Sequence, residues 1–294
     1  MSTAFGTLTI VKALVEAEKF IRKGELTWNP GNVHQQELMS RFAAIRNALP
    51  LVPTLEGWAR ETAEELNQIL AEHSFDIRLN PWPDDGNTFG VVAINDFTVL
   101  WRVVGQTVED WGSRRLITIN GKPAFRLKYD AGVEFLESDH LDEPVVKIPT
   151  ETGDVVYITK YSRSPDGFRL LESIEQLRGN LTPARRAHYE GVNIPMVKLG
   201  LHINIDWLVD LWTQAGVDTW RIAQALQEVK FAMNQFGARV KETTAVAVMR
   251  GMPNYYEVDG PFLIWIERAG VPVPLFMAHV TEDNLMDPGE LSNL

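Results

Sequence analysis

The sequence predicts an α+β fold in a single domain. Residues 1–72 carry apolar side chains at helical spacing, whereas residues 73–294 consist mainly of short runs with the alternation typical of strands. Helices that precede strands favour an α+β arrangement over a parallel, doubly wound sheet. No internal repeat, low-complexity tract or Gly/Ser-rich linker divides the 294 residues, so we expect one domain.

Three helices are expected in the first part. The run 7–24 places apolar residues on one face and ends at Gly24, and the run 34–49 does the same before Pro50. The run 55–70, "LEGWARETAEELNQIL", has similar spacing. The apolar positions of the three faces are Leu8, Val11, Leu14, Val15, Phe20, Leu38, Phe42, Ile45, Leu49, Leu55, Trp58, Leu66 and Leu70. We expect these faces to form the core.

Most of the remaining chain is expected to form antiparallel strands. Asn120-Gly121 lies between two of them and is a hairpin-turn signal. Short helical pieces are expected near 171–177 and 206–215, with a strand at 192–201 between them. The other expected strands cover 89–95, 97–104, 115–120, 124–129, 132–136, 144–149, 154–161, 221–237, 255–270 and 273–280.

Composition excludes several kinds of chemistry. There is no cysteine, so a disulfide framework, a zinc–thiolate site and a thiol nucleophile are excluded. The formal charge of −11 disfavours binding to nucleic acid or to anionic membranes and would attract a basic partner surface. No apolar run approaches the roughly 20 residues of a membrane span, and the first residues lack a secretion signal. A cytoplasmic location is therefore expected.

The usual catalytic motifs are missing from the sequence. No phosphate-binding glycine loop, H-E-x-x-H pair or G-x-S-x-G elbow occurs, and the six histidines are scattered. An acidic turn, "ESDHLDEP", gathers carboxylates at 137–143 and is the only candidate for a hard cation. A solvated turn is the simpler interpretation, because the run lacks a calcium-loop spacing. The small basic runs at 113–115 and 185–186 are interpreted as solvated surface rather than as a phosphate-binding track.

The last third of the chain resembles the serpin family of serine protease inhibitors. "YYEVDGPFLIWI" is similar to the family signature, here Val258, Asp259, Pro261 and Phe262, although Gly260 departs from it. "PLFMAHV" is similar to the closing strand, and 192–217 to the strand-then-helix passage before it. "FGVVAINDFTVLW" resembles the central strand that carries a buried asparagine, here Asn95 in the region where the sheet opens.

The resemblance covers the chain from about Phe89 to the end and is weak before it. Serpins usually run well beyond 294 residues, and the shortfall lies in the helical first part. The chain therefore resembles a shortened family member, of bacterial or phage type, with a divergent N-terminal part. The fold it implies places N-terminal helices on large, mostly antiparallel sheets, with an exposed reactive-centre loop at about 237–252.

In the family, a protease cuts this loop, and the loop then enters the main sheet as an added strand while the protease is still attached as an acyl-enzyme. A strand period of two gives an internal check on this expectation. One set of alternate positions is nearly all small or β-branched and would face inward: Ala238, Val240, Glu242, Thr244, Val246 and Val248. The other set, which begins at Arg239 and Lys241, carries the cations.

Two features of the hinge count against efficient insertion. Glu242 falls on the inward set, where an unpaired carboxylate costs several kcal/mol. Gln235 stands where the family usually has a glutamate before the hinge, so that ion pair is lost. The hinge residues are Gln235, Gly237, Arg239 and Lys241.

The scissile bond has two possible positions. Counting back from Pro261 places it at Arg250–Gly251, and counting forward from Gly237 places it at Gly251–Met252. We prefer Arg250, because an exposed arginine suits a protease whose specificity pocket holds a carboxylate. Arg250 is alternatively just a charged residue of an accessible loop.

Two functions follow from the resemblance. One is a monomeric inhibitor of a trypsin-like serine protease, and the other is a non-inhibitory binding or scaffold protein with the same fold. Neither is an enzyme, and neither requires a cofactor or a metal. An enzyme that uses the 137–143 turn is a third, remote alternative.

Overall fold

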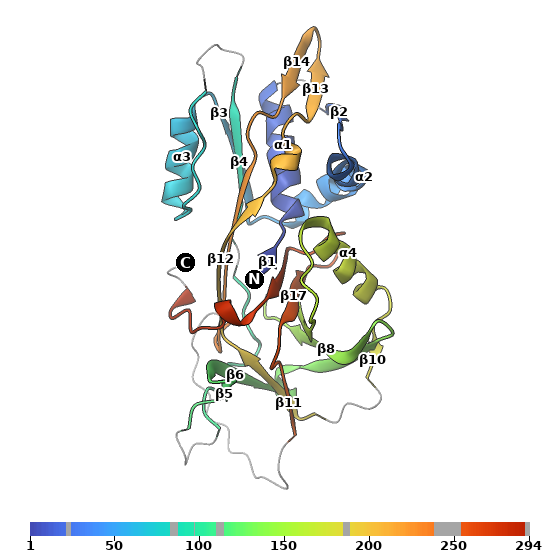
Figure 1. Ribbon diagram of the computed structural model, residues 1–294, viewed down its shortest axis with the longest axis vertical. Helices are drawn as coiled ribbons and strands as arrows, with labels where there is room; N and C mark the ends of the chain where they lie inside the picture. The colour runs from blue at the N-terminus through green and yellow to red at the C-terminus, as the bar shows by residue number, and fades with distance from the viewer. Residues whose placement is uncertain are drawn as a thin grey trace.

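The computed structural model describes residues 1–21, 25–82, 88–96, 98–109, 115–184, 189–237 and 254–291. The molecule is elongated, with most helices toward one end and the larger sheets toward the other (Figure 1). Three of the four α-helices lie within the first 72 residues, and the strands pair almost entirely antiparallel, which fits the predicted α+β class.

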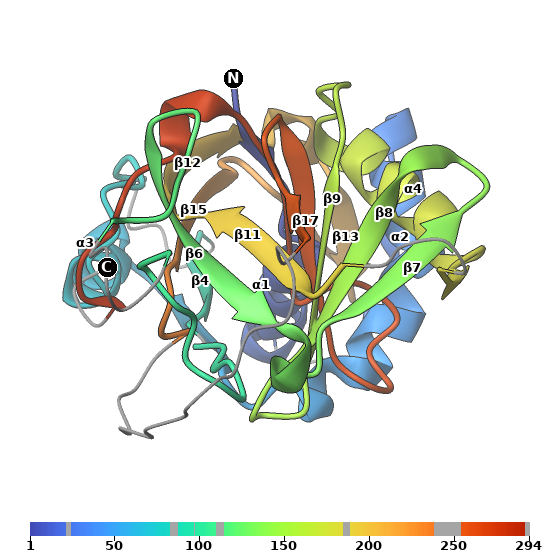
Figure 2. The same ribbon diagram turned by 90° about the horizontal axis from the view of Figure 1, so that it is seen from below.

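A seven-stranded antiparallel sheet forms one layer of the molecule (Figure 2). Two of its strands, β17 and β18, are buried along almost their whole length, which is why they read as continuous apolar runs. Helix α4 (Gly167–Arg178) packs against β18. The strand order is β1 (Thr3–Ala4), β18 (Phe276–Val280), β17 (Phe262–Glu267), β9 (Val155–Lys160), β8 (Leu141–Pro149), β7 (Glu134–Ser138) and β10 (Thr182–Pro183).

Four smaller sheets complete the described strands. One contains a parallel pair, β11 with β16, and the rest are antiparallel. The four-stranded sheet has the order β16 (Tyr255–Glu257), β11 (Gly191–Pro195), β6 (Lys122–Lys128), β5 (Thr118–Ile119), and the three-stranded sheet has the order β14 (Asp218–Arg221), β13 (Trp212–Ala215), β2 (Trp28–Asn29). The two remaining sheets are the pairs β12 (Val197–Asn204) with β15 (Leu226–Met233), and β3 (Leu55–Arg60) with β4 (Gly90–Asn95).

Two of the helices begin at a residue whose side chain caps the first turn. Asn32 accepts a hydrogen bond from the Gln35 backbone at the start of α2 (Val33–Ala48), and Thr62 does the same from Glu65 at the start of α3 (Ala63–Glu72). Four short 3₁₀ helices accompany them: η1 (Leu49–Leu51), η2 (Tyr129–Ala131), η3 (Asp206–Leu208) and η4 (Glu282–Asn284). In the described part, no helix is both long and apolar enough to cross a membrane.

The pair β3–β4 lies between two helices (Figure 1). Helix α1 (Thr7–Ile21) packs on one face of the pair and buries Leu8, Val11 and Leu14, as its spacing predicted. Helix α3 packs on the other face through Leu66 and Leu70, which cluster with Val92 and Ile94 of β4. This three-layer arrangement positions the edge of β4 that faces the candidate site.

Most local predictions are confirmed. The helices predicted at 7–24 and 34–49 are α1 and α2, and the helix at 171–177 lies within α4. Asn120 and Gly121 have φ of 51° and 75°, so both occupy the left-handed region that a tight hairpin turn requires. The predicted strands from 115 to 161 correspond to β5 through β9.

Three local predictions are wrong. Residues 55–60 form strand β3 rather than the first part of a helix. Only Leu55 and Trp58 support the helical spacing in this stretch, and pairing with β4 overrides it. Residues 206–215 form η3 and strand β13, since the hairpin partner β14 satisfies their backbone. The described residues of 97–104 form no strand, and Trp101 makes only an isolated bridge with Thr150.

Candidate functional site

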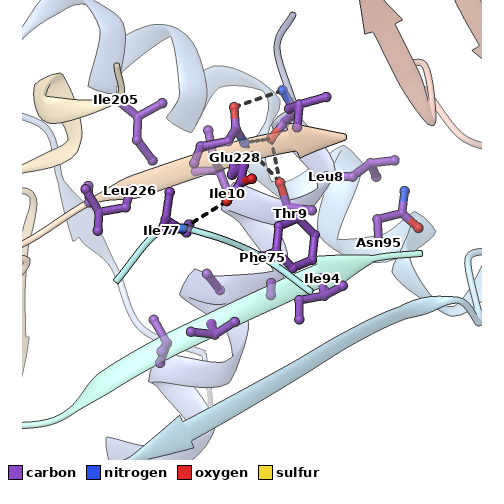
Figure 3. Close-up of a pocket in the computed structure, with 18 of the residues that line it drawn as sticks. Leu8, Thr9, Ile10, Phe75, Ile77, Ile94, Asn95, Ile205, Leu226 and Glu228 are labelled. Carbon is purple, nitrogen blue, oxygen red and sulfur yellow. Dashed lines mark hydrogen bonds between the residues drawn. The ribbon is translucent and has the colours of Figure 1, made fainter. Parts of the chain in front are cut away.

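A large cavity lies between β4 and β15 (Figure 3). Its volume is about 760 Å³, and its floor is formed by α1. Among the described residues, β4 pairs only with β3, and β15 pairs only with β12. The facing edges of β4 and β15 therefore present backbone groups that pair with no strand of the described chain, which is the geometry of a sheet that lacks a central member.

The walls of this cavity are mainly apolar. Leu8 and Ile10 belong to α1, Ile94 to β4 and Leu226 to β15 (Figure 3). A few polar groups lie among them, and most are already hydrogen-bonded within the protein. Gln227 of β15, for example, binds the Gly6 backbone and the Thr9 hydroxyl of α1. Such a lining suits small and β-branched side chains better than charged ones.

An extended segment, residues 75–82, crosses from α3 to β15 along the cavity, and we call it the crossing segment. The Glu228 carboxylate accepts hydrogen bonds from the Asp76 and Ile77 backbones at 2.8 and 3.0 Å. Only 2% of the Glu228 side chain is exposed. Asn67 of α3 pairs reciprocally with the Leu79 backbone. The crossing segment is thus fixed to both sides of the gap by side chains, without strand pairing.

The end of β15 is fastened to the chain that follows β4. The Trp101 indole Nε1 donates to the Asn234 carbonyl at 2.9 Å, and the Gly105 N–H donates to the Gln235 carbonyl at 2.8 Å. We call this place the mouth of the cavity. Gly237 follows directly, with φ of +51°, and an added Cβ there would lie 2.4 Å from the Trp101 nitrogen. Only glycine fits this position, so the backbone leaves β15 in a defined direction.

The structure brings two predicted site residues to the same cavity. Asn95, at the end of β4, and Gly237 both line it. Asn95 is half-buried; its side-chain oxygen accepts from the Thr54 hydroxyl at 3.1 Å, and its Nδ2 donates to the Leu275 carbonyl at 3.3 Å. Gln235 lies at the mouth, where its buried Oε1 has no hydrogen-bond donor among the described residues.

The rest of the predicted loop lies outside the described residues. These positions are Ala238, Arg239, Val240, Lys241, Glu242, Thr244, Val246, Val248, Arg250 and Gly251. The chain is described again from residue 254, and Tyr255 to Glu257 pair with β11 as strand β16. The two ends of the loop are thus placed, one at the mouth and one at the edge of the β16–β11 sheet.

A polar cluster holds β16 and the turn before β17. The Tyr256 hydroxyl donates to Glu143 at 2.9 Å, and Lys160 contacts Glu143 and Asp259 at 3.0 and 3.1 Å. Burial, followed by the Glu143 carboxylate, raises the pKa of Tyr256 well above its usual range. Burial lowers the pKa of Lys160, but its hydrogen bonds to Glu143 and Asp259 outweigh this effect and the pKa rises. These groups act as a structural fastening rather than as acid–base chemistry.

The acidic turn has a structural role in part. Glu143 belongs to the fastening just described, and the His140 imidazole contacts the Asn180 side chain. Across the described ranges, no group of three or more metal-ligating side chains comes together in a way that could hold a metal ion. The basic runs are only partly described, and Arg115 pairs with Glu109 at 3.6 Å.

Reasoning from the sequence missed the contacts that close the cavity. Glu228, Gln224 and Asn67 hold the crossing segment, and Asn234 holds the mouth. Glu228 lies within the expected strand 221–237, and a charged residue there reads in the sequence as an exposed position. The sequence therefore gives at most a weak signal of its buried role. The partners are distant in sequence and follow no local period, so their pairing could not be read from the chain.

Comparison with solved structures identifies the fold. The native thermophilic serpin Tengpin has a TM-score of 0.57 at 11% identity, with 96% of this chain and 88% of that chain covered. Native protease nexin-1 with heparin has a TM-score of 0.53 at 14% identity, with 94% and 98% covered. The thyroxine-binding globulin complex with thyroxine has a TM-score of 0.51 at 12% identity, with 97% and 93% covered. The chain therefore has the serpin fold over almost its whole length.

No family model matches the chain, and no curated protein matches its sequence. The low identities mean that the fold, rather than any activity, is what the solved structures share with this chain.

Proposed function

We propose that this protein inhibits a trypsin-like serine protease by loop insertion. The protease would cut at Arg250–Gly251, and the segment from Ala238 onward would enter between β4 and β15. The cavity between two strand edges that pair with no strand of the described chain is the observation that carries this proposal. The chain itself needs no catalytic group, because the mechanism uses the folding energy of the sheet and the serine of the protease.

Insertion would release energy from two sources. An entering strand would pair with β4 on one edge and β15 on the other, and each hydrogen bond contributes roughly 1 kcal/mol net. Its inward side chains would leave water, at about 0.8 kcal/mol per buried CH₂. Summed over a strand as long as β15, these terms reach the order of 10 kcal/mol.

The starting position of the loop supports the same proposal. Gly237, which follows β15 after three residues, lines the cavity, and Tyr255 to Glu257 hold the other end of the loop in a different sheet. The two described ends of the loop thus lie at different places, one at the mouth of the cavity and one at the edge of the β16–β11 sheet. Cutting the loop would free the segment that begins at the mouth to fold back into the slot between β4 and β15.

The residue before the scissile bond would set the target. Arg250 offers a cation to a specificity pocket with a carboxylate at its base, which is the feature of trypsin-like proteases. Replacing Arg250 with Ala should abolish cleavage by such enzymes at this bond and leave the fold intact.

A non-inhibitory protein of the same fold is the second candidate. Glu242 on the inward face and the unpaired Gln235 oxygen at the mouth favour it. In this case the loop is cut but does not insert, and the protein serves in binding or as a scaffold. Thyroxine-binding globulin, one of the solved structures that share the fold, is named for a small molecule rather than for a protease.

Incubation with trypsin and a denaturing gel separates the two candidates. A covalent adduct that resists SDS, with mass equal to trypsin plus residues 1–250, is the result expected of an inhibitor, because the peptide from Gly251 onward is the leaving group and separates in SDS. Cleavage at Arg250 without any adduct would contradict inhibition and support the second candidate. The variant Arg250→Ala is the matched control, because it should give neither adduct nor cleavage at this bond.

A further inference from the structure

The segment after η4 crosses the end of the β12–β15 pair. We call residues 285–291 the strap; it appears at the red end of the ribbon in Figure 1, beside β12. Leu285 bridges to Val197, whose other neighbour is Met233 of β15. The Asn284 side chain donates to the Lys198 carbonyl at 3.3 Å. The strap thus begins on the outer side of β12.

The strap then reaches the residue that follows β15. Asn234 Nδ2 donates to the Gly289 carbonyl at 3.0 Å, and Asn234 is only 2% exposed. The Oδ1 of the same side chain accepts from the Phe236 N–H at 3.0 Å, and the Asn234 carbonyl accepts from the Trp101 indole. One residue therefore joins the strap, the hinge and the chain that follows β4.

The strap has a shape of its own at this contact. Gly289 has φ of +74°, and its N–H donates to the Asp287 carboxylate at 2.9 Å, which forms a tight turn. This turn presents the Gly289 carbonyl to Asn234. Leu291, near the end of the strap, lines the cavity. The strap is therefore an ordered contact of the mouth rather than a peptide lying loosely on the surface.

We infer that Asn234 is a positioning residue through which the strap holds the point where the loop leaves the sheet. This inference rests on the proposed function. For a strand to enter at the mouth, the end of β15 must separate from Trp101 and Gly105, to which it is hydrogen-bonded. The strap binds the side chain of the same residue whose carbonyl Trp101 holds, so it restricts the movement of Asn234 that this separation requires. Its contacts should therefore slow insertion before cleavage.

The variant Asn234→Asp tests this inference. Aspartate keeps the oxygen that accepts from Phe236 and replaces the Nδ2 donor with an oxygen that repels the Gly289 carbonyl. Amide hydrogen exchange of residues 235–237 and 287–291 should become about 5- to 10-fold faster, the effect of losing roughly one hydrogen bond. On storage, the uncut variant should also lose its capacity to form the trypsin adduct by a similar factor faster than the unmodified protein.

Asn204→Asp is the matched control. Asn204 also accepts from the backbone two residues ahead, at Asp206, but it lies at the opposite end of β12 and is exposed. Both readouts should stay at the unmodified values. A second variant, Asp287→Ala, loosens the turn of the strap while leaving Asn234 intact, and it should change both readouts in the same direction as Asn234→Asp.

Each outcome decides one point. Unchanged exchange at 235–237 in both Asn234→Asp and Asp287→Ala would overturn the inference, as would faster exchange without faster loss of adduct capacity. If the unmodified protein forms no adduct at all, the proposed function fails and the positioning role toward insertion fails with it. The exchange measurement would then still show whether the strap orders the hinge.

Discussion

At the residue scale, Gly237 shows how one backbone position defines the loop exit. We predict that Gly237→Ala lowers the free energy of unfolding by about 1–3 kcal/mol, because the added Cβ meets both a left-handed backbone and the Trp101 nitrogen. Urea denaturation measures the change. Gly200→Ala on β12 is the control, since nothing lies within 4 Å of its Cβ position, and a loss of equal size there would contradict the explanation.

His279 provides a pH dependence. Burial lowers its pKa; its Nε2 contacts the Tyr161 carbonyl at 3.0 Å, and its buried Nδ1 has no partner among the described residues. Because the folded pKa lies below that of the unfolded chain, the unfolded state gains a proton first as the pH falls. The stability that His279 contributes is therefore present above about pH 6.5 and is lost on acidification, by up to about 1.4 kcal/mol per pH unit.

Unfolding free energies measured between pH 7 and pH 5 test this dependence. The slope that His279 causes should disappear in His279→Gln, whereas His140→Gln, which changes an exposed histidine, should keep it. An unchanged slope in His279→Gln would show that other groups cause the acid sensitivity.

Glu242 is the residue that limits insertion in the proposed register. We predict that Glu242→Ala lowers the number of inhibitor molecules consumed per protease inactivated, because the inward face then carries no charge. Lys241→Ala, on the outward set, should change this number much less. The stoichiometry of inhibition with trypsin measures both, and equal effects of the two variants would show that the faces are assigned incorrectly.

At the element scale, the crossing segment is held by side chains that cross the gap. Glu228→Ala removes the acceptor of two backbone N–H groups, so amide exchange at Asp76 and Ile77 should become at least 10-fold faster. Hydrogen exchange measures this directly. Glu56→Ala on β3 is the control, because Glu56 is exposed. Slow exchange at both amides in Glu228→Ala would mean that packing of Phe75 and Ile77, rather than Glu228, holds the segment.

Elements with a strong local period were predictable from the sequence, and those that depend on distant partners were not. The face of α1 and the Asn120-Gly121 turn are local features, and both are confirmed. Strand β3 was mistaken for helix, because Leu55 and Trp58 fit a helical spacing while the preference for strand comes from β4, 35 residues away. The cavity could be anticipated only through the family resemblance, and its closing contacts at Glu228 and Asn234 could not be anticipated at all.

At the scale of the whole molecule, the cavity predicts how the protein responds to cleavage. If the loop inserts after cleavage at Arg250, the added strand should raise the thermal midpoint of unfolding by on the order of 20 °C. This follows from a stabilisation of about 10 kcal/mol divided by the unfolding entropy expected for a chain of this length. Differential scanning calorimetry of the cut and uncut protein measures this shift. A midpoint that falls or stays constant after cleavage would mean that the slot remains empty.

The large sheet also constrains the order in which the chain can fold during synthesis. Strand β9 ends at Lys160, yet its neighbour β17 begins only at Phe262, and β1 pairs with β18 at Phe276–Val280. At translation rates of about 5–20 residues per second, the ribosome needs roughly 5 to 20 s to add the intervening hundred residues. During that interval the edge of β9 has no partner, and the nascent polypeptide must depend on chaperones or on its own residual structure to avoid aggregation.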